Sequence, residues 1–394
     1  MRITGSMITK IANSKFGIGG GIMAVFTGTL MLISNERDFK MIGDAIREAE
    51  SVVVELDDAN SLDTEMDGKL TYGVSTIQTD EFVVDELFDV SINAIKLTRV
   101  VKYYQWVEIE EEESDDESSY TTYYYEKQWT DAPVNSSKFN DSRYRSDNWV
   151  IMEIDNLTKW ADIVNWGAYI LPQFIKKEIK GENPVTINLS PQVKEMFEKA
   201  LVKCASGHTA SALIKASDHE YVHNFKVNTL HFGTDPSKPA IGDVRVEINH
   251  IPPGGDLSVI AQVMGNTFTE YIAKNGRTFF SVYNGNDSME KMFKREHSNN
   301  AWNAWAMRVF LTILVILGMR FTLKPVNMLF SRIPLLGSIV NVGIKIATTM
   351  LGLAWSLIVI ALAWFFYRPL ITLIIFTVVA AIIFLLKKMG EKRA

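Results

Sequence analysis

The chain has 394 residues, of which 47% are hydrophobic, and a formal net charge of −6. Of its 46 acidic residues, 45 (46 − 1) lie between Glu36 and Glu296, and the exception is Glu391. Outside that window the chain is apolar and its charges are almost all basic. This distribution excludes a wholly soluble protein and predicts a multi-pass membrane protein with one large water-exposed domain.

Residues 1–15 contain three basic and no acidic side chains, which predicts a short cytoplasmic N-terminus. Residues 16–34 read FGIGGGIMAVFTGTLMLIS, close to the roughly 20 apolar residues that a transmembrane helix needs. Ser34 is followed directly by Asn35, Glu36 and Arg37 rather than by a small-residue cleavage site. We therefore predict that residues 16–34 form transmembrane helix 1, an uncleaved signal anchor.

Residues 35–300 are predicted to form an α+β, strand-rich domain on the extracytoplasmic or lumenal side. Short β-branched or alternating runs predict strands at residues 51–56 and 69–74. Two aromatic-rich runs, residues 100–109 and 120–129, predict a hairpin. The acidic run between them, residues 110–117 (EEEESDDE), is too charged to bury and is expected to connect the two strands.

A helix is predicted from Pro191 onward, with Ser190 as its N-cap and Pro191 at its first position. Further strands are predicted at residues 242–248, 257–263, 268–273 and 278–283, and a final helix at residues 288–300. Residues 35–300 hold 27 of the 40 basic residues, so their net charge is 27 − 45 = −18. A surface with this charge argues against nucleic acid as a partner. Cys204 is the single cysteine, which excludes an internal disulfide.

The C-terminal quarter contains three further apolar stretches, predicted as transmembrane helices 2, 3 and 4, at residues 301–319, 344–366 and 370–386. Residues 320–343 are apolar but interrupted by proline and glycine, which predicts an interfacial or re-entrant segment broken at Pro325, Pro334 and Gly337. This segment and the basic tail, residues 387–394, are predicted to be cytoplasmic. The expected architecture is therefore four transmembrane helices in a 1 + 3 arrangement, with both termini in the cytoplasm.

Arg308 lies about two turns into transmembrane helix 2, where an unpaired charge is costly. One interpretation is a polar contact with another span or with a neighbouring subunit. The other is that Trp302 and Trp305 mark the membrane interface and that Arg308 snorkels back to it. Both interpretations are open at this point.

The residues His219-Glu220-Tyr221-Val222-His223 match the spacing of a zinc hydrolase helix, with histidines as ligands and Glu220 as general base. The alternation of Tyr221, His223 and Phe225 instead indicates a strand, on which the two histidines would lie roughly 13 Å apart. Glu247 is a candidate third ligand, but glutamates are common in any chain, so it adds little support for a metal site. We therefore expect no catalytic, cofactor or metal site, and a membrane-anchored zinc metalloprotease is kept as the alternative.

Five strings occur in order along the chain: residues 102–108 (KYYQWVE), 241–246 (IGDVRV), 296–299 (EHSN), 340–345 (VNVGIK) and 364–370 (WFFYRPL). Together with the span layout, they resemble the LUMA family, also called the transmembrane protein 43 family. The resemblance implies four spans, a large lumenal domain, self-association and no established enzymatic activity. It also implies residence in the endoplasmic reticulum and inner nuclear membrane in animals. The short N-terminal segment is compatible with a prokaryotic homologue in the plasma membrane.

The sequence thus predicts a non-enzymatic membrane scaffold that needs no cofactor. It is expected to contact membrane lipids, to form homo-oligomers and to organise other membrane proteins. A second alternative is an extracytoplasmic sensor, in which the acidic run at residues 110–117 binds cations or a basic ligand.

Overall fold

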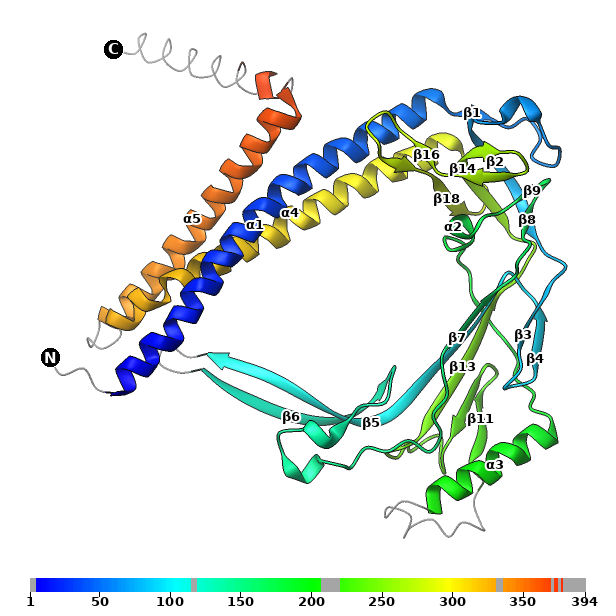
Figure 1. Cartoon of the computed structure of the whole chain (residues 1–394), viewed down its shortest axis with the longest axis horizontal. Helices are drawn as coiled ribbons and strands as arrows, with labels where there is room; N and C mark the ends of the chain where they lie inside the picture. The colour runs from blue at the N-terminus through cyan, green and yellow to red at the C-terminus, as the bar shows by residue number, and fades with distance from the viewer. Residues whose placement is uncertain are drawn as a thin grey trace, which may run out of the picture.

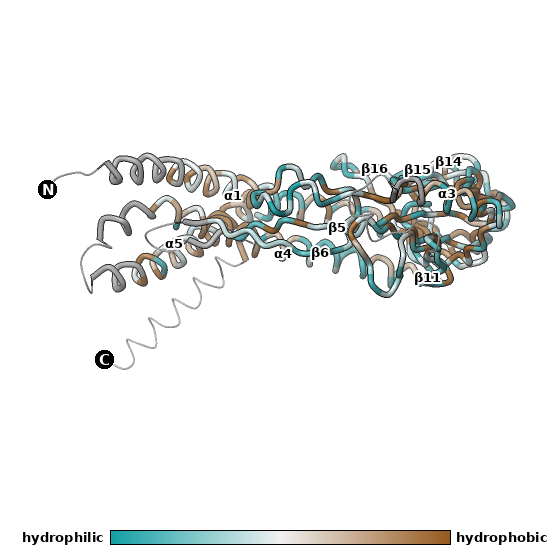
Figure 2. Tube along the Cα trace, turned by 90° about the horizontal axis from the view of Figure 1, so that it is seen from below, coloured by the Kyte–Doolittle hydropathy of each residue, from teal (hydrophilic) through white to brown (hydrophobic). Residues whose placement is uncertain are grey.

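The computed structural model describes residues 5–114, 119–206, 220–330, 336–369, 372–374 and 377. Long helices lie on one side of the molecule and a β-rich domain on the other (Figures 1 and 2). The helices are α1 (Gly5–Val52), α2 (Gln173–Lys176), α3 (Pro191–Ser206), α4 (Met289–Phe330) and α5 (Leu336–Tyr367), with short 3-10 turns at Thr64–Met66, Ser136–Lys138 and Ser142–Tyr144.

Three helices in the described part are long and apolar enough to cross a membrane, and they contain the predicted spans 1, 2 and 3. The helices α1 and α4 lie side by side, and both continue well past the length that a bilayer needs (Figure 1). They therefore form a stalk that reaches the β domain. The predicted fourth span, residues 370–386, lies mostly outside the described residues.

Several boundaries differ from the sequence prediction: the strands predicted at residues 268–273 and 278–283 are each divided in two, and three other differences lie in the stalk and the hairpin. The predicted break at Pro325 is wrong, because α4 continues through this residue to Phe330. A proline removes one backbone hydrogen bond, and a long membrane helix tolerates that loss when its neighbours compensate. The strand predicted at residues 51–56 is shortened to β1 (Val54–Glu55), because α1 runs on to Val52. The acidic run is not only a connection, because β5 continues to Ser114.

The β domain contains two seven-stranded sheets and two small hairpins. The first sheet has the order β1-β2-β8-β9-β15-β14-β18, and an additional pairing of β2 with β14 closes part of this path on itself. Its strands are β1, β2 (Leu70–Gln78), β8 (Asn165–Trp166), β9 (Tyr169–Ile170), β14 (Asp256–Met264), β15 (Thr267–Thr269) and β18 (Ser281–Asn284). Early and late parts of the domain therefore share one sheet.

The second sheet has the order β11-β12-β13-β5-β6, with β10 beside β13 and β7 beside β5. Its strands are β5 (Lys96–Ser114), β6 (Ser119–Thr130), β7 (Leu157–Trp160), β10 (Asn183–Pro184), β11 (Val222–Lys226), β12 (Thr229–Phe232) and β13 (Val244–Ile251). The small hairpins are β3 (Phe82–Asp85) with β4 (Val90–Asn93), and β16 (Tyr271–Ile272) with β17 (Thr278–Phe279).

One apolar core connects both sheets and α3. Phe197 of α3 stacks on Phe88 with ring centroids 5.4 Å apart, and its edge meets Phe232 of β12 at 5.3 Å. All three side chains are buried. The Ser190 hydroxyl accepts a hydrogen bond from the backbone N–H of Val193, so the predicted N-cap of α3 is confirmed.

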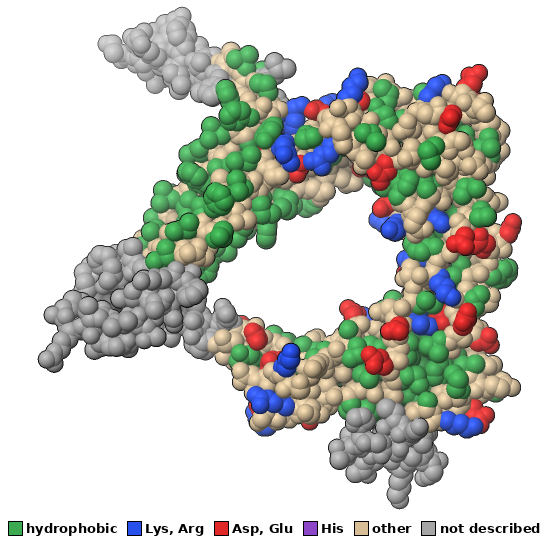
Figure 3. All heavy atoms as spheres, in the orientation of Figure 1, with side chains coloured by type: hydrophobic (Ala, Val, Ile, Leu, Met, Phe, Trp, Pro, Cys, Tyr) green, Lys and Arg blue, Asp and Glu red, His purple; other side chains and the backbone are tan. Residues whose placement is uncertain are grey.

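The predicted hairpin is confirmed and is longer than expected. β5 and β6 pair from Tyr103 opposite Thr130 to Ser114 opposite Ser119. The hairpin extends from the second sheet and curves back toward the helices, and an open space separates it from the stalk (Figures 1 and 3).

Candidate functional site

The most unusual feature of the helices is a buried ion pair between α1 and α4. The Arg308 guanidinium donates from Nε to Glu36 Oε1 at 2.5 Å and from Nη2 to Glu36 Oε2 at 2.7 Å. Trp364 of α5 donates from its indole Nε1 to the same Glu36 Oε2 at 2.7 Å. One carboxylate therefore connects all three long helices, at one end of their apolar stretches.

This ion pair is almost completely removed from solvent, since Glu36 is 1% and Arg308 is 4% exposed. The guanidinium carbon of Arg308 lies 4.7 Å from the ring centre of Trp305 and 5.1 Å from that of Phe39. The bidentate geometry and the aromatic faces offset part of the cost of desolvating two charges. The structure therefore confirms the first interpretation of Arg308, a polar contact with another span.

Glycines allow α1 and α4 to approach closely deeper in the apolar stretch. A Cβ on Gly21 would lie 2.6 Å from the backbone oxygen of Gly318, and a Cβ on Gly318 would lie 2.8 Å from the backbone oxygen of Gly21. Only residues without side chains fit such a backbone contact between membrane helices. The same region of α1 contains Gly19, where an added Cβ would meet nothing within 4 Å.

A second set of contacts fixes the stalk to the β domain. The Tyr271 hydroxyl donates to Glu48 of α1 at 2.9 Å, and the Asn275 side-chain amide donates to the backbone oxygen of Met41 at 2.7 Å. At the start of α4, Asp287 pairs with Lys291 and Arg295, and the hydrogen bond from Lys291 lowers the pKa of Asp287. The α1 part of the stalk is therefore fixed to the β domain by polar contacts, and the start of α4 is stabilised by its own ion pairs.

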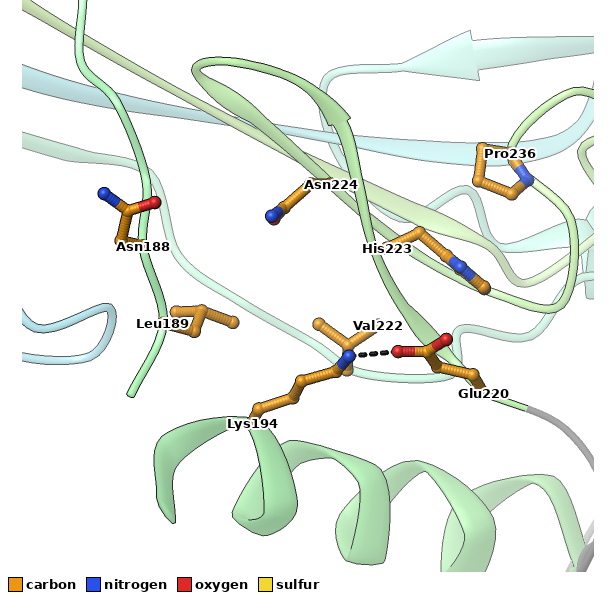
Figure 4. A pocket seen from close by; sticks show the side chains of 8 residues that line it. All are labelled: Asn188, Leu189, Lys194, Glu220, Val222, His223, Asn224 and Pro236. Carbon is orange, nitrogen blue, oxygen red and sulfur yellow. Dashed lines mark hydrogen bonds and ion pairs between the residues drawn. The ribbon is translucent and has the colours of Figure 1, made fainter. Parts of the chain in front are cut away.

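The histidine motif does not form a zinc helix in the described residues. His219 lies outside them, and His223 lies on strand β11, as the alternation predicted. Glu220 pairs with Lys194 of α3 beside a pocket of about 480 Å³ (Figure 4), and the hydrogen bond from Lys194 lowers the pKa of Glu220. A lowered pKa makes Glu220 a weaker general base. Within the described ranges, no cluster of three His, Cys, Asp or Glu side chains suits a metal ion.

His223 instead lies directly opposite His231 in the register of β11 and β12, with ring centroids 6.3 Å apart. The ring of His231 is fully buried, and its Nε2 lies 3.3 Å from Asp243 Oδ2. Glu247, the candidate third ligand, lies on β13 and accepts from the side chain of Asn249 at 2.9 Å. Of these side chains, His231 is buried in the second sheet, His223 is half-buried and Glu247 is exposed.

Comparison with known proteins assigns the chain to a family. The family model described as Transmembrane protein 43 matches residues 103–369, which is more than half of the chain. The chain belongs to the transmembrane protein 43 family. This confirms the resemblance found in the sequence.

Relatives in this family align over most of their length. Transmembrane protein 43 of Mus musculus is 25% identical over 376 residues, covering 92% of this chain and 87% of the relative. The Homo sapiens protein is 25% identical, with 93% and 88% covered. The Transmembrane protein 43 homolog of Drosophila melanogaster is 27% identical, with 78% and 76% covered. No solved structure shows a significant match to the chain.

The family match includes Arg308 and Trp364 but begins after Glu36. Sequence reasoning singled out Arg308 and missed its partner, because Glu36 looked like one more acidic residue of the water-exposed domain. Its position two residues after the first span was the available signal. Counted from the predicted span ends, however, Glu36 lies about 3 Å outside the first span and Arg308 about 10 Å inside the second, so the pairing could not be read from membrane depth.

Proposed function

We propose that this member of the transmembrane protein 43 family is a non-enzymatic membrane scaffold that self-associates and positions other membrane proteins. The observation that carries the proposal is the Glu36–Arg308–Trp364 contact, which ties α1, α4 and α5 together where they leave their apolar stretches. Held at this point, the stalk presents the β domain in one orientation. A fixed orientation is what a scaffold requires of its docking surfaces.

The apolar outer faces of the spans support the self-association part of the proposal. Met350 and Leu357 of α5 are 68% and 65% exposed. Lipid or a second copy must cover them in a membrane. The deciding experiment is the native particle mass of the full chain in lipid nanodiscs. A homo-oligomer is expected, and a strictly monomeric particle without a co-purifying protein would overturn the proposal.

Cys204 offers a way to find the contact face, since it is the single cysteine. In a Cys204→Ser background, Met350→Cys should form disulfide-linked dimers in native membranes if α5 lines the interface. Asp131→Cys, on the exposed loop after β6, is the matched control and should remain monomeric. Crosslinking at both positions alike would indicate random collision rather than a specific interface.

The proposal places both termini in the cytoplasm and residues 35–300 on the other side. It is supported by the basic residues of 1–15, and by the antiparallel run of α1 and α4, through which the domain leaves and rejoins one face of the membrane. The sequon at Asn140, which is exposed, gives a direct test. Expressed in a eukaryotic cell, the chain should be glycosylated there, and Asn140→Gln should remove that glycan. A chain that stays unmodified at all its sequons would contradict this orientation.

A further inference from the structure

The charges around the ion pair do not balance. Four cationic side chains meet where the end of α5 approaches α1, and we call them the boundary basic cluster: Lys40, Arg47, Arg308 and Arg368. Two carboxylates lie among them, Glu36 and Asp44, so the local net charge is 4 − 2 = +2. This positive excess lies beside residues 35–300, whose net charge is −18.

Both carboxylates already have cationic partners within the cluster. Glu36 accepts both hydrogen bonds from Arg308, and Asp44 pairs with Lys40 and Arg47 on consecutive turns of α1. Arg368 is therefore left without a carboxylate among the described residues. Its Nε is buried and has no hydrogen-bond partner in that part of the chain.

The guanidinium of Arg368 is nevertheless held in place. Its carbon lies 4.1 Å from the ring centre of Phe39, the ring that Arg308 also faces. The backbone N–H of Arg368 donates to the Trp364 oxygen at 2.7 Å, which continues the last turn of α5. A positioned, partly desolvated guanidinium with no carboxylate partner in the described part of the chain is suited to bind an oxyanion through two parallel hydrogen bonds.

The surroundings of Arg368 identify that oxyanion. Phe365 and Phe366, three and two residues before it in the chain, are 56% and 74% exposed, so acyl chains must cover this end of α5. The next group outward from the acyl chains in a bilayer is the phosphate of the lipid headgroup. In the space-filling view, Lys and Arg side chains gather next to the apolar surface of the helices (Figure 3).

We propose that Arg368, supported by Lys40 and Arg47, binds the headgroup phosphate of an anionic phospholipid at the outer end of α5. The lipid supplies the negative charge that Glu36 and Asp44 do not, and its chains cover the exposed phenylalanines. The site holds a lipid on a single copy of the chain, so it does not depend on self-association.

The test uses the full chain in nanodiscs of phosphatidylcholine with a minor fraction of phosphatidylglycerol, released for native mass spectrometry. Wild-type protein should retain phosphatidylglycerol, and Arg368→Gln should retain about tenfold less, the loss expected for a charge-assisted bidentate contact. The matched control is Arg143→Gln, because Arg143 is exposed and paired with Asp141 in the water-exposed domain. That control should retain as much lipid as wild type.

Three results would overturn the assignment. Equal retention by Arg368→Gln and wild type would exclude Arg368 as the ligand. Displacement of the lipid by millimolar inorganic phosphate would show a site for free anions, and equal retention of phosphatidylcholine would show no preference for negative charge. If Arg368→Gln does not fold, Phe39→Leu keeps the charge and removes the ring beneath it, and it should weaken retention about threefold. Unchanged retention in that variant would also contradict the proposal.

Discussion

Replacing Glu36 with glutamine, which exchanges one carboxylate oxygen for an amide nitrogen, should strongly destabilise the helical part of the protein. In Glu36→Gln the amide keeps the shape and can still accept from Trp364, but the Arg308 guanidinium loses its counter-charge while it stays buried. Removing one partner of a buried ion pair costs about 3–5 kcal/mol, because the remaining charge is uncompensated. Trp305 and Trp364 lie against the pair, so their fluorescence can report the loss.

The measurement is unfolding by sodium dodecyl sulfate in mixed micelles, followed by tryptophan fluorescence. The matched control is Glu195→Gln on α3, since Glu195 pairs with Lys199 on the surface, where solvent screens the pair and its loss should barely move the transition. Combining Glu36→Gln with Arg308→Gln should cost less than the sum of the two single changes, because no unpaired charge remains. A cost below about 1 kcal/mol for Glu36→Gln, or strict additivity in the double variant, would refute the reasoning.

Three further predictions follow from the same contacts. Gly21→Ala should cost about 1–3 kcal/mol in the same unfolding assay by pushing α4 away, whereas Gly19→Ala should be neutral or stabilising, and equal effects would exclude the close backbone contact. Because its pKa is lowered, Asp287 adds stability at pH values above its ordinary pKa of 3.8, and this stability is lost as the pH falls through the lowered folded-state pKa. Asp287→Asn should therefore flatten the acid limb of the curve of stability against pH. Elemental analysis should find no stoichiometric zinc in purified protein, and bound zinc that disappears in His223→Ala would revive the hydrolase alternative.

The sequence predicted the elements with strong local signals. Three of the four predicted spans, the long hairpin and α3 follow from apolar length, aromatic alternation and the Ser190–Pro191 start, and the structure has the hairpin, α3 and three helices long and apolar enough to cross a membrane. Helix ends were less predictable. Nothing in residues 35–52 distinguishes a soluble loop from a stalk, because that helix is stabilised by packing Ile46 and Ala49 against Met292 and Phe293 of a segment far along the chain.

The order of the strands in the sheets could not be predicted from the sequence either. The pairing of β2 with β14 and of β5 with β13 joins residues more than 140 positions apart, and no local pattern specifies which strand meets which. The partner of Arg308 was equally hard to predict from the sequence. A single arginine in a span indicates a partner by its cost alone, but the identity of that partner depends on how α1 and α4 are aligned along their length.

The alignment of α1 with α4 connects the site to the proposed function. Glycine contacts near Gly21 set how closely the two helices approach, and the Glu36–Arg308 pair sets their position along the axis, since a shift of one turn would separate the charges by about 5 Å. Because the domain is fixed to both helices by contacts such as Tyr271 with Glu48, that same alignment determines its orientation. A change inside the membrane can therefore alter how the domain meets its partners without touching the domain itself.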